Sequence, residues 1–178
     1  LAGSAHATVF FTDGFDYPDG QLTSEDPTES GLGANVSGGL WTAHSGGGVS
    51  GAGRYVDVVS GQAELLIDGS EDVNRTTGGT IMGEGETWYY AAKFTVNDMR
   101  ADPLTEALDN EYFIHFMSDF ATLRGRAYVS APQNGGTDYT LGWSASSGGQ
   151  TITWGSDLSF GTQYTIVASY SFDDGNST

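Results

Sequence analysis

Residues 111–144 read EYFIHFMSDFATLRGRAYVSAPQNGGTDYTLGWS, and the pattern of this stretch decides the fold. We expect three consecutive antiparallel strands, with the first at Glu111–Ser118 and the second at Leu123–Ser130. The turn Asn134-Gly135-Gly136-Thr137 predicts a tight two-residue hairpin into the third strand, because glycine supplies the positive φ that such turns need. The stretch therefore predicts a β-meander.

The expected register sorts these side chains onto two faces, because side chains alternate along a strand. If Ser118 faces Leu123, the apolar face joins three cross-strand pairs: Ile114 with Ala127, Phe116 with Gly125, and Tyr112 with Val129. The opposite face mixes aromatic and charged groups: Glu111, Phe113, His115, Met117, Arg124, Arg126, Tyr128 and Ser130. The second turn adds Tyr139, Leu141 and Trp143 to this mixed face. A slip of one residue at either turn would reverse the assignment.

The rest of the chain repeats the same signals. Thr87–Asn97 and Gln163–Phe172 alternate large apolar side chains with polar or small ones, and a hairpin is expected around Ser60-Gly61-Gln62. Residues 8–16 predict a first strand, and the only expected helical turn lies at Leu104–Leu108. About ten strands with glycine-rich turns predict an all-β sandwich or barrel of antiparallel sheets.

Composition excludes several classes of partner. The chain has 178 residues with 27 Gly, 6 Lys+Arg and 23 Asp+Glu, so its formal net charge is -17. Such a charge opposes binding to nucleic acid and to anionic membrane surfaces. It suits a soluble secreted protein or one that meets divalent cations. The chain has no Cys, so disulfides and thiolate metal sites are excluded.

The two ends suggest a secreted fragment. Ala5-His6-Ala7 resembles the tail of a secretory signal peptide, so we assign residues 1–7 to a signal-peptide remnant. The last residues, Asp173–Thr178, have turn chemistry with no strand behind them. We therefore expect one domain over residues 8–178 that is truncated at its C-terminus.

Four phrases in order carry a resemblance to a known superfamily. They are FTDGFDYPDG at Phe11–Gly20, TWYY at Thr87–Tyr90, RGRAYV at Arg124–Val129 and LSFGTQY at Leu158–Tyr164. Together they resemble secreted bacterial domains of the concanavalin A-like lectin/glucanase superfamily, of the laminin-G-like type. The resemblance implies an antiparallel two-sheet jelly-roll sandwich with one concave face. It also implies carbohydrate binding in many relatives, calcium at the rim in some, and surface modules without a known ligand in others.

Glycoside hydrolysis is the enzymatic hypothesis, and it needs two carboxylates flanking the bond. Catalytic members of the superfamily carry E-x-D-x-E or E-x-D-x-x-E on one strand, and this chain has no such run. The nearest pairs are Glu84-Gly85-Glu86 and Asp109-Asn110-Glu111, both at expected strand beginnings, where acids are usually solvated. We therefore assign no catalytic residue and favour a non-enzymatic role.

Calcium is the candidate cofactor, and nothing in the sequence requires a cofactor. Carboxylate oxygens suit calcium, and Asp109 and Glu111 precede a strand, so these two residues are the candidate ligands. The alternative is a solvated acidic turn. The histidines lack zinc-ligand spacing.

The mixed face is the candidate ligand site. Aromatic faces and planar polar groups hold sugars, and this face offers both. The candidate binding residues are Phe113, His115, Arg124, Arg126, Tyr128 and Trp143. The alternative is that these aromatic rings form core and the arginines form a structural ion pair.

We expect a non-catalytic module, secreted or at the cell surface, whose partner is a polysaccharide or another cell-surface polymer. A structural or adhesive domain without a small ligand is the alternative, and a glycoside hydrolase is the third hypothesis.

Overall fold

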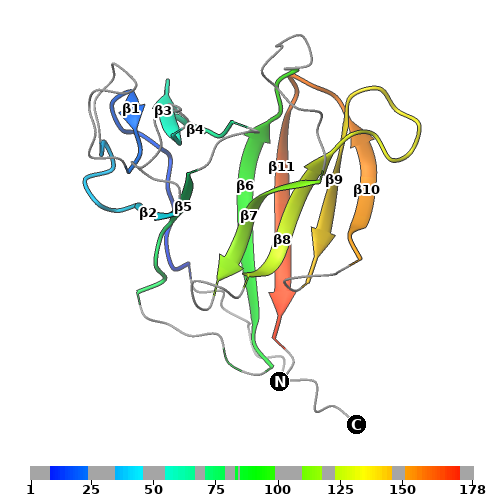
Figure 1. Cartoon of the computed structure of the whole chain (residues 1–178). Coiled ribbons are helices and arrows are strands. Elements are labelled where there is room, and N and C mark those ends of the chain that lie inside the picture. Colours follow the sequence, from blue (N-terminus) through cyan, green and yellow to red (C-terminus); the bar gives the residue numbers. More distant parts are fainter. Residues whose placement is uncertain are drawn as a thin grey trace, which may run out of the picture. The chain divides into compact units, whose positions relative to one another are not determined.

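The structure of the chain is a computed structural model. The structure describes residues 9–23, 35–45, 55–66, 71–78, 83, 85–98, 110–117, 123–145 and 151–172. Every regular element in these ranges is a β-strand (Figure 1), and every strand pair is antiparallel. The prediction of an all-β fold built from antiparallel sheets is confirmed. The helical turn expected at Leu104–Leu108 lies outside the described residues.

The chain divides into two compact units, Leu1–Thr80 and Ile81–Thr178, and each is described by itself. That one jelly-roll domain spans residues 8–178 stays a prediction. None of the described segments forms a helix long and apolar enough to cross a membrane.

The first unit contains two small sheets. Its strands are β1 (Gly20–Gln21), β2 (Thr42–Ser45), β3 (Asp57–Val59), β4 (Gln62–Glu64) and β5 (Asp72–Asn74). They pair in the orders β1-β3-β4 and β2-β5. Leu22, Val56 and Val58 form its buried core.

Two local predictions in this unit have opposite outcomes. The β3–β4 hairpin is confirmed, with Ser60 and Gly61 at φ 52 and 74, the positive values that a two-residue turn requires. The strand expected at residues 8–16 is wrong, because residues 9–16 form no strand. Phe15 has φ 54, which interrupts any extended run there.

A carboxylate orders this first segment instead of a strand. Asp13 accepts hydrogen bonds from Tyr17 Oη and Trp41 Nε1 at 2.7 Å each, and forms a 2.8 Å ion pair with Arg75. Burial raises the pKa of Asp13, but hydrogen bonds from Trp41, Tyr17 and the Phe15 N–H, together with the Arg75 charge, outweigh burial and lower the pKa below its ordinary value. The residues around 9–17 are therefore held by side-chain contacts.

The second unit is a two-layer β-structure. Its strands are β6 (Thr87–Thr95), β7 (Glu111–Met117), β8 (Leu123–Ser130), β9 (Tyr139–Ser144), β10 (Thr153–Leu158) and β11 (Gln163–Ser171). They form a four-stranded sheet, β10-β9-β8-β7, and a two-stranded ribbon, β11-β6. Figure 1 shows the ribbon behind the sheet.

The core of this unit lies between the sheet and the ribbon. Tyr139 and Leu141 from β9 and Ile166 from β11 are its buried centre. Alternation in β6 and β11 directs one face of the ribbon toward it, and the two strands pair over their full length, from Gln163↔Thr95 to Ser171↔Thr87. The two long alternating strands predicted from the sequence are confirmed.

The register between β7 and β8 differs from the expected one. Ile114 lies opposite Ala127 as predicted, but Tyr112 lies opposite Tyr128 and Phe116 opposite Arg124. The pairing shifts between Tyr112 and Ile114 and again between Ile114 and Phe116. Each such irregularity places an extra residue in one strand and disturbs the alternation of its side chains. The faces predicted for Tyr112 and Phe113 are therefore wrong: Tyr112 shares a face with Tyr128, and Phe113 packs on the core.

The connection from β8 to β9 also differs from the expected hairpin. It comprises residues 131–138, and Ser130↔Thr140 is the last pair before it. In this register Trp143 lies opposite Ala127 and Leu141 opposite Val129. The placement of Tyr139, Leu141 and Trp143 on the face of Tyr128 is thus wrong, because all three pack in the core between sheet and ribbon.

This placement predicts that Trp143→Ala destabilises the protein. Truncating a packed indole leaves a cavity, so the free energy of unfolding should fall by about 3 kcal/mol. Urea unfolding followed by circular dichroism measures the change. Tyr89→Ala is the matched control, because the Tyr89 side chain is 65% exposed on β6 and should be nearly neutral. Equal stabilities of Trp143→Ala and the wild type would contradict the core placement.

Candidate functional site

The side of the β7–β10 sheet turned away from the ribbon, called the outer face below, is the candidate site. The core side of β8 and β9 carries residues that pack in the core or lie opposite core residues: Ala127, Val129, Leu141 and Trp143. The residues between them therefore point away from the ribbon. These outward positions carry Arg126, Tyr128 and Ser130 on β8 and Thr140, Gly142 and Ser144 on β9. The outer face thus combines aromatic, cationic and hydroxyl groups.

One cross-strand row spans all four strands of this face. Tyr112 lies opposite Tyr128, Tyr128 opposite Gly142, and Gly142 opposite Trp154. Neighbouring strands lie about 4.8 Å apart, so the row extends about 14 Å across the sheet. We call this set of four residues the aromatic row. It places three large rings along one line, with a glycine between the second and the third.

Gly142 makes room for the indole of Trp154. A Cβ built on Gly142 would lie 2.4 Å from Trp154 Cε3 and 2.5 Å from Ile152 Cγ2. Real Cβ contacts are not that short, so both side chains lie directly over the glycine. The indole is therefore held against the sheet, and any larger residue at position 142 would push it away.

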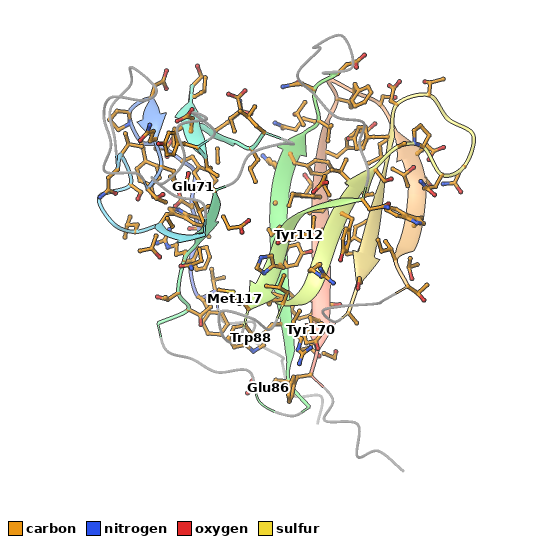
Figure 2. The ribbon with its side chains drawn as sticks, in the orientation of Figure 1. Glu71, Glu86, Trp88, Tyr112, Met117 and Tyr170 are labelled. Atoms are coloured by element: carbon orange, nitrogen blue, oxygen red, sulfur yellow. The ribbon has the colours of Figure 1, made fainter. Side chains whose placement is uncertain are left out.

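Arg126 lies beside the two tyrosines of the row and contacts both rings. Its guanidinium carbon lies 5.5 Å from the centre of the Tyr112 ring and 5.2 Å from that of Tyr128, within cation–π range. His115 packs edge-on against Tyr112 with ring centres 5.6 Å apart, and its Nδ1 lies 3.1 Å from the Phe116 carbonyl oxygen. Figure 2 labels Tyr112 beside β7. Tyr112 is 37% exposed and Tyr128 only 6%, so the row is open at its β7 end.

The structure brings together three of the predicted binding residues: His115, Arg126 and Tyr128. Phe113 and Trp143 belong to the core. Arg124 lies opposite Phe116, and the Phe116 ring contacts Trp88 and Tyr90 of the ribbon. The register therefore separates Arg124 from the aromatic row.

Sequence reasoning missed three members of the aromatic row: Tyr112, Gly142 and Trp154. Tyr112 was assigned to the core because the irregular pairing of β7 has no sequence signature. Trp154 had an available signal: a glycine inside a strand, here Gly142, marks close approach of another group. Pairing β10 with β9 would have placed the tryptophan over it.

A carboxylate next to the row fixes the β8–β9 connection. Asp157 lies opposite Thr140 and accepts hydrogen bonds from the Gly136 N–H at 2.7 Å and the Gln133 N–H at 3.0 Å. The Asn134 N–H at 3.1 Å and the Thr140 hydroxyl also donate to it. The hydrogen bond from Thr140 is the main cause that lowers the pKa of Asp157 to about 2, with further lowering from the backbone donors. Asp157 is therefore an acceptor that anchors a loop.

The candidate metal ligands are not brought together by the described residues. Glu111 is exposed at the start of β7, and Asp109 lies outside the described residues. Among the residues that the structure describes, no group of three or more His, Cys, Asp or Glu side chains is placed to hold a metal ion. Calcium at Asp109 and Glu111 stays a prediction.

Comparisons with known proteins identify no relative. No protein-family model, no curated protein and no solved structure matches the chain. The chemistry of the outer face is therefore the basis for a functional proposal.

The low pKa of Asp157 predicts a stability that depends on pH. Its folded pKa of about 2 lies below the ordinary value of 3.8, so the ionised carboxylate stabilises the fold above about pH 4. That stabilisation should be lost as the pH falls from about 4 to about 2. Asp157→Asn should therefore lower the melting temperature at pH 7, and the difference from wild type should shrink over the acidic window.

Glu111→Gln is the matched control for this series, because Glu111 is an exposed carboxylate of the same sheet. Its melting temperature should follow that of the wild type at every pH. An Asp157→Asn protein as stable as wild type at pH 7, or a deficit that persists unchanged to pH 2, would contradict the anchoring role.

Proposed function

We propose that the outer face binds a polysaccharide, and that the chain is a non-catalytic, extracellular carbohydrate-binding module of the jelly-roll type. The observation that carries the proposal is the aromatic row with the Arg126 guanidinium in cation–π contact with two of its rings. The extracellular location and the kinship with concanavalin A-like domains belong to the same proposal. They rest on the sequence resemblance and the Ala5-His6-Ala7 pattern.

The chemistry of the row suits a sugar. The rings of Tyr112 and Trp154 present apolar faces that can pack against the C–H side of a pyranose. The Arg126 guanidinium has a planar set of donors that can reach two hydroxyl groups at once. Side chains held by their neighbours lose little conformational entropy on binding, and the cation–π contacts of Arg126 provide this restraint.

The shape of the row favours a polymer over a single small ligand. It runs about 14 Å across four strands, and its two ends, Tyr112 and Trp154, are more exposed than Tyr128 and Gly142 between them, so the ends can contact separate units of a chain. The chain's formal net charge of -17 opposes polyanions, which makes a neutral polysaccharide the favoured ligand class.

A binding role also fits the carboxylate on this face. Hydrolysis of a glycosidic bond requires two carboxylates across the bond, one of them able to donate a proton. Asp157 is committed to the β8–β9 connection, and its pKa of about 2 keeps it ionised and unable to donate near neutral pH. We therefore assign the outer face to binding.

The proposal predicts the behaviour of two variants on polysaccharide. Trp154→Ala and Tyr112→Ala should each weaken binding about tenfold, which corresponds to about 1.4 kcal/mol. A glycan array identifies the ligand, and affinity electrophoresis in gels containing it measures the loss. Tyr89→Ala is the matched control, because it removes an exposed tyrosine from the β6 face that points away from the core.

Three results would decide against the proposal. Wild-type protein that is retained by no glycan would favour the structural or adhesive alternative. Equal loss of binding in Tyr89→Ala and Trp154→Ala would show that the outer face is not the site. Cleavage products released from a bound polysaccharide would favour the hydrolase hypothesis.

A further inference from the structure

A row of oxygen-bearing side chains crosses the β1-β3-β4 sheet of the first unit. Gln21 lies opposite Asp57, and Asp57 lies opposite Glu64. Directly paired residues project from the same face of a sheet, with Cβ atoms about 4.5–5.5 Å apart. Val58 belongs to the core on the other face, so these three side chains leave the sheet on the side away from that core.

Two side chains of this row are buried without hydrogen-bond partners. Gln21 is 0% exposed, and neither its Oε1 nor its Nε2 has a partner among the described residues. Asp57 Oδ1 is also buried without a hydrogen-bond partner among the described residues. A buried amide or carboxylate oxygen without a partner is rare in folded proteins and costly. Gln21 and Asp57 are directly paired across the strands, so one bound group can reach an oxygen of each side chain.

A second buried carboxylate lies close to the row. Glu71, labelled at the start of β5 in Figure 2, is only 7% exposed. It accepts hydrogen bonds from the Val56 N–H at 2.7 Å and from the Thr23 hydroxyl. Both donors are neutral, so neither of them balances the negative charge of Glu71. Each carboxylate oxygen retains a lone pair for a further ligand.

Among the described residues, this region holds no uncommitted positive charge. The row places the carboxylates of Asp57 and Glu64 opposite each other, and Glu71 is hydrogen-bonded to the Val56 N–H next to Asp57. Arg75 is the only Lys or Arg of this unit within the described residues, and it is paired with Asp13 at 2.8 Å. The acidic row is therefore a place where a cation would relieve like-charge repulsion.

We propose that Gln21 Oε1 and the carboxylates of Asp57 and Glu71 bind a divalent cation with the preferences of calcium. Calcium accepts a mixed set of amide, carboxylate, backbone and water oxygens in a flexible geometry, whereas magnesium demands a regular octahedron and keeps its waters. The donor set has two carboxylates and an amide, so it does not form a cluster of three acidic or histidine ligands. It is separate from the calcium ligands expected at Asp109 and Glu111 and independent of the outer face.

The test uses the full chain stripped with a chelator and dialysed into buffer of constant ionic strength. Calcium chloride should raise the melting temperature by about 5 °C or more once it exceeds its dissociation constant about a hundredfold. Isothermal titration calorimetry should show a calcium-binding event, with magnesium binding at least about tenfold more weakly.

Three variants locate the site. Asp57→Asn and Gln21→Leu should each weaken calcium binding about tenfold or more in calorimetry. Both should remain folded, because Gln21→Leu removes a buried amide without partners and Asp57→Asn removes a charge at nearly constant shape. Asp16→Asn is the matched control, since it removes the same charge from an exposed position in the same unit. It should bind calcium as the wild type does.

Wild-type protein with no calcium-dependent shift and no calorimetric signal would overturn the proposal. Equal weakening by Asp16→Asn and Asp57→Asn would overturn it as well, because diffuse attraction to an acidic chain would then explain binding.

Discussion

The pairing of β7 with β8 is the constraint on which the second unit depends. Ile114 and Ala127 fix one point of contact, and the pairing shifts on both sides of Ile114. These shifts allow Ile114 and Phe113 to pack on the core while Tyr112 and His115 meet on the outer face. A strand with strict alternation would have sent Tyr112 inward with Ile114.

The outer face follows from that pairing and from one glycine. Once Tyr112 lies opposite Tyr128, the antiparallel order β7-β8-β9-β10 continues the line through Gly142 to Trp154. The missing side chain at position 142 gives the indole a place against the sheet. Arg126 then lies near both tyrosine rings, so a cation is restrained in the middle of an aromatic surface. Binding chemistry on this face is a consequence of backbone register.

The sequence predicts those features that depend on local pattern. Alternation located β6 and β11, and Ser60-Gly61 located the β3–β4 turn, because both signals are contained in a few neighbouring residues. The outer face was predicted only in part, since His115, Arg126 and Tyr128 were placed correctly and Trp143 was not. The errors arise from contacts distant in sequence: Asp157 orders the 131–138 connection from more than 20 residues away in its bonds to Gln133 and Gly136. No local pattern encodes such a bond or the shifts in β7.

The pairing of Tyr112 with Tyr128 is the most direct test of this account, and nuclear Overhauser spectroscopy on isotope-labelled protein can measure it. With this pairing, cross-peaks should join the Tyr112 and Tyr128 rings, whose centres are 6.2 Å apart, and the Phe113 and Phe94 rings, whose centres are 6.0 Å apart. Cross-peaks that instead join Phe113 to Tyr128 would show a β7 with unbroken alternation. That result would move Phe113 to the outer face and contradict the aromatic row.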